Sequence, residues 1–205
     1  MTEARGRVEV IAGPMFAGKT EELLRRVRRA TIAGRQVALF GHALDTRAGT
    51  GRIASHAGLD APSTQLVSPA EIAAAVDAGS TDIVAIDEAH FFGSDLEPVV
   101  AELAGRGLVV IVAGLDVTFT GEPFEPLPAL MAPAEQVDKL TAICTICGDE
   151  AIFHARVAPS GSTDVRLVTE NVGGAETYQA RCRRHFSRGG RSGSDGTGSS
   201  GRTSP

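Results

Sequence analysis

Aromatic residues are scarce in this chain of 205 residues, which has eight Phe, one Tyr and no Trp. A core built from it is mostly aliphatic, and the lone tyrosine, Tyr178, stands apart. Because 42% of the residues are hydrophobic, a packed globule is still expected. Cysteines are few as well, and three is an odd number, which argues against a disulfide framework.

Long apolar segments are missing too. The longest apolar run covers residues 108–113 and is far too short to span a bilayer. Residues 1–7 are polar and charged, unlike a secretory signal, so we expect a cytoplasmic location and no membrane partner. The net charge is −5, and this acidic balance argues weakly against nucleic acid as the main partner.

A phosphate-loop pattern near the amino terminus organises the chain. An apolar run at residues 8–12 predicts a buried strand, and a helix is expected from about Lys19 to Ala33. Between them the residues fit G-x-x-x-x-G-K-[ST], whose glycines let backbone N–H groups turn toward phosphate oxygens. Lys19 would reach the β- and γ-phosphates of ATP, and the Thr20 hydroxyl would bind Mg²⁺. The competing interpretation is an ordinary glycine turn with Lys19 in solvent. The expected ATP-binding residues are Gly13, Pro14, Met15, Phe16, Ala17, Gly18, Lys19 and Thr20.

Further apolar runs at residues 36–41, 82–86 and 108–114 alternate with helical segments and predict a parallel α/β sheet. Two capping boxes, beginning at Ser68 and Ser94, indicate helix starts. The run 82–86 ends in two acids, Asp87 and Glu88. An acidic pair at this place is the expected partner of a phosphate loop, and Asp87 would then bind the magnesium ion or its water shell. Alternatively, the two acids cap the loop that follows the strand.

The stretch of residues 42–62 is polar and rich in glycine, with little periodicity. A connection this long is usually functional or mobile. It leaves the end of a strand near the phosphate loop, where α/β sheets place their ligands, so Asp45 and Arg47 could reach metal and phosphate. An ion pair within the loop explains their spacing equally well.

The last third of the chain carries a metal-binding pattern. Cys144 and Cys147 form a C-x-x-C knuckle, and Cys182 and His185 supply C-x-x-H. Three thiolates and one imidazole suit a closed, structural Zn²⁺ site, whereas the alternative, a redox C-x-x-C, usually opens a helix. We therefore expect a nucleotide-binding domain at 1–140, a zinc-binding domain at 141–186 and a disordered Gly/Ser/Arg tail at 187–205.

Together these motifs resemble the zinc-containing thymidine kinase family (type II) of bacteria. The resemblance covers roughly residues 7–186 and implies a recombinase-like P-loop core, with helices on both faces of a parallel sheet, plus a small zinc-bound lasso. The stretches that carry it are residues 13–20, 45–47, 87–92, 114–116, 121–124, 139–144 and 173–178.

The resemblance implies ATP-dependent phosphorylation of the 5′-hydroxyl of thymidine, and also of deoxyuridine, in nucleotide salvage for DNA synthesis. Glu88 matches the general base, and Asp45 and Arg47 match residues near the phosphates and metal. A homotetramer and inhibition by thymidine triphosphate are implied as well. The implied nucleoside-binding residues are Met15, Phe91, Leu115, Phe119, Phe124, His154, Val172, Gly173 and Tyr178.

Two positions depart from the family pattern. His90 stands where the family usually has Gln, and His154 stands where many members have Thr near the base. The fourth metal ligand, His185, is a variant seen in bacterial members. Two other functions stay open: an ATP-driven nucleic-acid-binding module with a zinc knuckle, and a noncatalytic nucleotide-binding regulator. The acidic composition disfavours the nucleic-acid-binding module. The presence of both a complete phosphate loop and the acidic pair disfavours the noncatalytic regulator.

Overall fold

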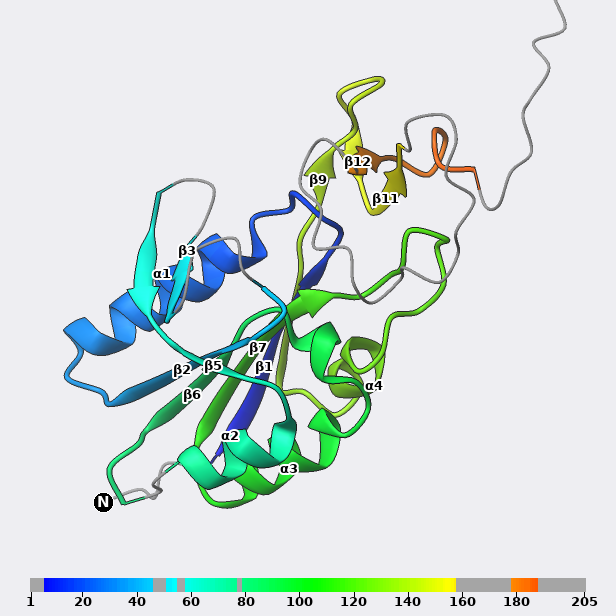
Figure 1. The fold of residues 1–205 in the computed structure, drawn as a ribbon. Coiled ribbons are helices and arrows are strands. Elements are labelled where there is room, and N and C mark those ends of the chain that lie inside the picture. The colour runs from blue at the N-terminus through cyan, green and yellow to red at the C-terminus, as the bar shows by residue number, and fades with distance from the viewer. Residues whose placement is uncertain (1–5, 46–50, 55–57, 77–78, 158–177, 188–205) are drawn as a thin grey trace, which may run out of the picture.

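A six-stranded sheet forms the centre of the computed structural model, which describes residues 6–45, 51–54, 58–76, 79–157 and 178–187 (Figure 1). The strand order is β5-β2-β6-β7-β1-β8, and every neighbouring pair runs parallel. This confirms the expected parallel α/β class. The strands of this sheet are β1 (Arg7–Gly13), β2 (Val37–His42), β5 (Thr64–Leu66), β6 (Ile83–Ile86), β7 (Val109–Leu115) and β8 (Gln136–Lys139).

Helices cover both faces of the sheet. On one face, Leu23, Leu24 and Val27 of the first helix pack on apolar side chains of β1, β6 and β7. On the other face, Ile72, Val100 and further leucines of the remaining helices form a second buried cluster. The helices are α1 (Lys19–Ile32), α2 (Pro69–Ala75), α3 (Leu96–Gly105) and α4 (Leu127–Met131), with a 3₁₀ turn η1 (Ala89–Phe92).

The parallel register brings four functional segments to one edge. β1 lies between β7 and β8, with Gly13 opposite Leu115 and Ala12 opposite Lys139. β6 lies between β2 and β7. Because parallel strands share one carboxyl edge, the loops that follow β1, β2, β6 and β7 emerge together, which is where open α/β sheets bind ligands.

Short antiparallel pairs complete the fold. β9 (Ala142–Ile143) pairs with β10 (Glu150–Ala151), and β11 (Phe153–Arg156) pairs with β12 (Tyr178–Arg181). Figure 1 shows β9, β11 and β12 grouped beyond one end of the central sheet. Since β9 follows directly on β8, this group begins at the carboxyl edge. Within the described part of the chain, no helix combines the length and apolar character that a bilayer crossing needs.

Some local expectations are confirmed and others are wrong. The capping box at Ser68 is present, with Pro69 in the first turn of α2. The one expected at Ser94 is wrong, because α3 starts at Leu96 after Asp95 and no side chain caps it. The stretch 42–62, expected to be a long irregular connection, contains the hairpin β3 (Arg52–Ala54) and β4 (Asp60–Pro62).

Candidate functional site

The phosphate loop connects β1 to α1 with an unusual backbone. Phe16 has φ 68°, although it is not a glycine, and Gly18 has φ 82° directly before the helix. Gly18 brings no side chain to the amino terminus of α1, where backbone N–H groups and the helix dipole favour an anion. Lys19 is 9% exposed, and its Nζ donates a hydrogen bond to the Pro14 carbonyl at 2.8 Å. The loop thus has the curled shape that a phosphate site requires.

The acidic strand end lies against this loop. Asp87 follows β6 and is only 2% exposed. Its Oδ2 accepts a hydrogen bond from the Thr20 hydroxyl at 2.9 Å, and its Oδ1 accepts one from the backbone N–H of Glu88 at 3.0 Å. A hydroxyl and a carboxylate oxygen side by side are the ligand types that Mg²⁺ prefers beside nucleotide phosphates. The structure therefore joins two predicted magnesium ligands that lie 67 positions apart in the sequence.

Glu88 occupies a strained position beside the same site. Its φ of 49° and ψ of 42° are left-handed, a conformation that ordinary residues keep mainly where surrounding contacts demand it. Its side chain is 12% exposed, and Oε2 lies 3.6 Å from Nδ1 of the buried His90. That nitrogen accepts a hydrogen bond from the backbone N–H of Leu115 at 3.3 Å, so it has no proton to donate to Glu88. The neighbouring histidine thus lies between the predicted base and the wall of the predicted nucleoside pocket.

The aromatic residues predicted for the nucleoside pocket fall into two contact groups. In the first, the His90 ring lies 4.3 Å from Phe91 and 5.0 Å from Phe124, centroid to centroid. In the second, Tyr178 lies 6.5 Å from Phe119 and 5.8 Å from His154. The second group joins the loop after β7 to strands β11 and β12, so part of the predicted pocket spans both halves of the chain.

His154 is the most buried polar member of this set. It is 3% exposed, and its Nδ1 has no hydrogen-bond partner within the described residues. Burial lowers its pKa to about 4, helped by the positive charge of Lys19 and by His90. The ring is therefore neutral at pH 7 and offers one donor and one acceptor nitrogen. An unpartnered polar atom beside the phosphate loop suits contact with a ligand.

For the other predicted site residues, the structure gives a position with few contacts or describes no position. Met15 is half-buried in the phosphate loop, and Leu115 is buried at the end of β7. Asp45 lies in the turn after β2, where its N–H donates to the His42 carbonyl at 2.9 Å. The remaining three predictions, Arg47, Val172 and Gly173, lie outside the described residues.

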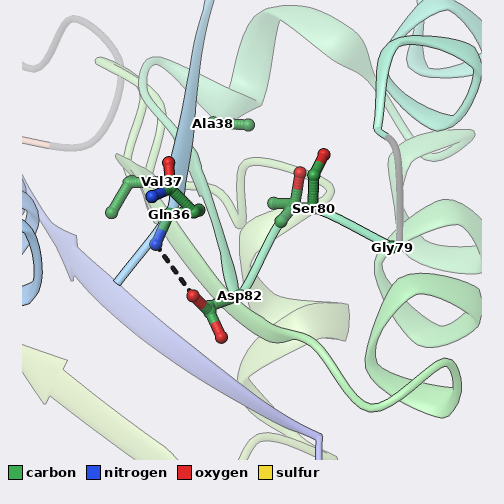
Figure 2. Close-up of a pocket in the computed structure, with 7 residues that line it drawn as sticks. Gln36, Val37, Ala38, Gly79, Ser80 and Asp82 are labelled. Carbon is green, nitrogen blue, oxygen red and sulfur yellow. Dashed lines mark hydrogen bonds between the residues drawn. The ribbon is translucent and has the colours of Figure 1, made fainter. Parts of the chain in front are cut away.

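A hollow at the opposite end of the sheet is unrelated to this site. Figure 2 shows it at the amino ends of β2 and β6, where the Gln36 N–H donates to the Asp82 carboxylate at 2.8 Å. It encloses about 680 Å³, and none of the predicted site residues lines it. The lining residues are Gln36, Val37, Ala38, Gly79, Ser80, Thr81 and Asp82.

The four predicted zinc ligands form one cluster. Their ligand atoms all lie within 4.8 Å of one another. A tetrahedral Zn²⁺ with Zn–S bonds of about 2.3 Å would separate its sulfur ligands by about 3.8 Å. The Cys147 and Cys182 sulfurs are 3.7 Å apart, and His185 Nδ1 lies 3.3 Å from the Cys182 sulfur and 3.7 Å from that of Cys144. This geometry fits a closed zinc site.

The environment of the cysteines also favours metal ligation over redox chemistry. Cys144 and Cys147 lie in the turn between β9 and β10, and do not open a helix. Burial opposes ionisation of Cys144, but backbone N–H groups around the cluster and His185 outweigh it and lower the pKa of the thiol to about 5. A thiol held as a thiolate is prepared to bind a metal ion.

Sequence reasoning missed an ion pair between a buried aspartate and a half-exposed lysine at the same edge of the sheet. Asp116 follows β7 and is 4% exposed, and its Oδ2 lies 2.6 Å from Nζ of Lys139 at the end of β8. The pair spans the end of β1, which lies between those strands. The signal was available, because Asp116 repeats the pattern of an acid directly after an apolar strand.

Several proteins named thymidine kinase are similar to this chain. A family model described as "Thymidine kinase" matches residues 6–186. A thymidine kinase of Halobacterium salinarum is 49% identical over 180 residues, covering 87% of this chain and 92% of that protein. One of Haloquadratum walsbyi is 43% identical over 211 residues, with 87% and 93% covered. One of Deinococcus radiodurans is 44% identical over 185 residues, with 85% and 87% covered.

Proposed function

The chain belongs to the thymidine kinase family, and from this premise we propose that it transfers the γ-phosphate of ATP to the 5′-hydroxyl of thymidine and also of deoxyuridine. The observation that carries this proposal is the 2.9 Å hydrogen bond between Thr20 and Asp87. It unites the phosphate loop with the acidic strand end, and Glu88 is the next residue along the chain. Phosphoryl transfer needs these parts in one place.

ATP binds with its phosphates in the loop of residues 13–20. Backbone N–H groups of the loop and the amino terminus of α1 hold the phosphate oxygens, and Lys19 exchanges its bond to the Pro14 carbonyl for the β- and γ-phosphates. Thr20 and Asp87 would hold Mg²⁺, which neutralises charge on the phosphates when it is bound. Asp45 and Arg47 are proposed to lie near the phosphates and the metal ion at the same place.

Glu88 is proposed to act as the general base. Its carboxylate accepts the proton of the 5′-hydroxyl as that oxygen attacks the γ-phosphorus, and the bond from the γ-phosphorus to the bridging oxygen breaks to release ADP. The left-handed backbone of Glu88 orients the carboxylate at the site, beside His90. The two aromatic groups around Phe91 and Tyr178 would bind the base, and His154 would contact it. Residues near Val172 and Gly173 are proposed to close over the base through backbone groups.

Several wider features stay predictions. The division into domains at 1–140 and 141–186 with a tail at 187–205, and a cytoplasmic location, rest on the sequence. A homotetramer and feedback inhibition by thymidine triphosphate rest on the family resemblance. The Cys144, Cys147, Cys182 and His185 cluster is proposed to hold structural zinc, because its spacing fits a tetrahedral ion.

The proposal is tested with a panel of nucleosides and ATP labelled at the γ-phosphate. We expect labelled 5′-monophosphates of thymidine and deoxyuridine, and none with the Lys19→Met variant, since that change removes the main phosphate-binding cation. No labelled nucleotide, together with ATP hydrolysis stimulated by DNA, would support the nucleic-acid module instead. ATP binding without any turnover would support the noncatalytic regulator.

A further inference from the structure

The zinc module, defined here as residues 142–156 and 178–186, packs directly against the phosphate loop. Ala17, in the middle of the loop, is partly buried against a small core of this module. Two of the predicted zinc ligands, Cys144 and Cys182, belong to that core. Its members are Ala142, Cys144, Ala151, Ala180 and Cys182.

A second contact encloses the first residue of the loop. The backbone N–H of Leu140, just before the module, donates to the Ala12 carbonyl at 2.8 Å. A Cβ on Gly13 would lie 2.5 Å from the Leu140 carbonyl oxygen and 3.4 Å from Cβ of Ala17. Gly13 is therefore held between the connection to the zinc module and the loop residue that packs on it.

His154 lies on β11 of the same module, opposite Ala180 of β12, and is buried. The module thus meets the phosphate loop at Ala17, and the chain that leads into the module encloses Gly13. The cluster that Ala17 touches consists of alanine and cysteine side chains, and the module also holds the stacked rings of Phe153 and Phe186. A module this small has little apolar core, so its shape depends strongly on a bound metal ion.

We propose that the zinc module holds the phosphate loop in shape through its contact with Ala17, which acts as a positioning residue. Zinc binding then strengthens the binding of a nucleoside triphosphate, even when no nucleoside is present. This inference rests on the proposed role of residues 13–20 in phosphate binding. It differs from a role of zinc in nucleoside binding alone, because the coupled ligand is the triphosphate.

Zinc removal tests the coupling on the full-length protein. Zinc is removed with a chelator and then restored, and binding of Mg²⁺–ATPγS without nucleoside is measured by calorimetry. We expect the Kd to rise about tenfold on removal and to recover on restoration. Circular dichroism and amide exchange in β1 and β7 establish that the sheet stays folded. Unchanged affinity in a folded, zinc-free protein would overturn the proposal.

Reciprocity gives a test that needs no zinc-free protein. If zinc tightens Mg²⁺–ATPγS binding, the nucleotide must tighten zinc binding by the same factor. We expect zinc transfer to a chromophoric chelator to require about tenfold more chelator when Mg²⁺–ATPγS is bound. The Lys19→Met variant, which binds the nucleotide poorly, corrects for chelation by the nucleotide itself. An equal zinc affinity with and without nucleotide would contradict the coupling.

Ala17→Val tests the proposed contact point. The larger side chain should push the loop away from the module, so Mg²⁺–ATPγS binds less tightly although one zinc per chain remains. In this variant, zinc removal should change the nucleotide Kd by less than about twofold, because the coupling runs through the contact. Ala101→Val, on an exposed part of α3, serves as the matched control. Full coupling in Ala17→Val would exclude Ala17 as the positioning residue.

Nucleoside phosphorylation enters none of these measurements, so their failure is separate from failure of the proposed kinase activity.

Discussion

Asp87 and Glu88 are consecutive acids with different environments. Asp87 is almost fully buried, and its two oxygens accept hydrogen bonds from the Thr20 hydroxyl and from the backbone N–H of Glu88. Glu88 turns away through a left-handed backbone and stays partly accessible beside His90. A buried carboxylate whose oxygens are hydrogen-bonded is held in one place, as a metal ligand must be. A carboxylate that a substrate can reach is able to accept its proton. The difference in environment supports the proposed division of roles.

His154 gives a pH-dependent prediction at this scale. Its pKa is lowered from 6.5 in the unfolded chain to about 4 in the fold, so the unfolded state binds the extra proton between these values. Its neutral form therefore contributes stability that is present above pH 6.5 and is lost as the pH falls toward 4. Between pH 7 and 5, we expect the wild type to lose about 2 kcal/mol more unfolding free energy than His154→Gln.

Urea unfolding at both pH values checks this difference. Zinc content must be measured in parallel, because acid also releases metal from thiolate sites. Both proteins keep the same four ligands, so metal loss cancels in the comparison. An identical loss of stability in wild type and His154→Gln would show that the imidazole does not titrate as described.

At the scale of elements, an ion-pair network fixes α1 to the edge of the sheet. The Arg26 side chain is 11% exposed and binds three carboxylates, those of Glu9 on β1, Glu22 on α1 and Asp138 on β8, at 2.6–2.8 Å. Arg25, its neighbour, pairs with Glu22 but is 54% exposed. The network holds the helix that follows the phosphate loop against the strand that precedes it.

Replacing Arg26 should therefore matter far more than replacing Arg25. Arg26→Met removes the cation that the three carboxylates share, although Glu9 keeps its pair with Arg7 and Glu22 keeps its pair with Arg25. We expect a loss of about 2 kcal/mol of unfolding free energy. Arg25→Met removes an exposed pair, and the expected change is about 0.5 kcal/mol or less. Denaturant unfolding of both variants measures these values. Equal effects would mean that the network around Arg26 contributes no more than a surface pair.

Local signals predict some elements and miss others for physical reasons. Residues 108–114 are a continuous apolar run, and residues 8–12 are apolar except for Glu9, because both faces of these central strands are covered. Strand β8, with Gln136, Val137, Asp138 and Lys139, carries no such pattern, since it is an edge strand and most of it is exposed. The Ser94 capping box failed because the same residues can form a turn instead, here with the Glu97 N–H on the Ser94 carbonyl.

At the scale of the whole molecule, the Cys144, Cys147, Cys182 and His185 cluster is proposed to hold a zinc ion that stabilises a segment with a small core of its own. That core consists of a cluster of alanine and cysteine side chains and the stacked rings of Phe153 and Phe186. A structural zinc ion supplies about 10 kcal/mol or more. The four ligands were predictable from spacing, because C-x-x-C and C-x-x-H impose geometry. Contact between Ala17 and this core was not, because packing between distant segments leaves no local pattern.

In the candidate site, too, features that follow from a local pattern were predictable and features that depend on strand order were not. The phosphate loop and the acidic pair follow from local strand–loop–helix and strand-end patterns, so Lys19, Thr20, Asp87 and Glu88 could be named before any coordinates. The pairing of Asp116 with Lys139, and the link from Glu88 through His90 to Leu115, depend on strand order. Strand order is a property of the whole sheet, which single-segment patterns do not encode.

Single-turnover transfer of labelled phosphate from ATP to thymidine, compared between wild type and Glu88→Gln, tests the central claim most directly. The substitution keeps the shape of the side chain but removes the proton acceptor. We predict that the transfer rate falls by about 10²–10⁴-fold while the fold and Mg²⁺–ATPγS affinity stay unchanged. Transfer by Glu88→Gln at close to the wild-type rate would contradict the assignment of Glu88 as the base.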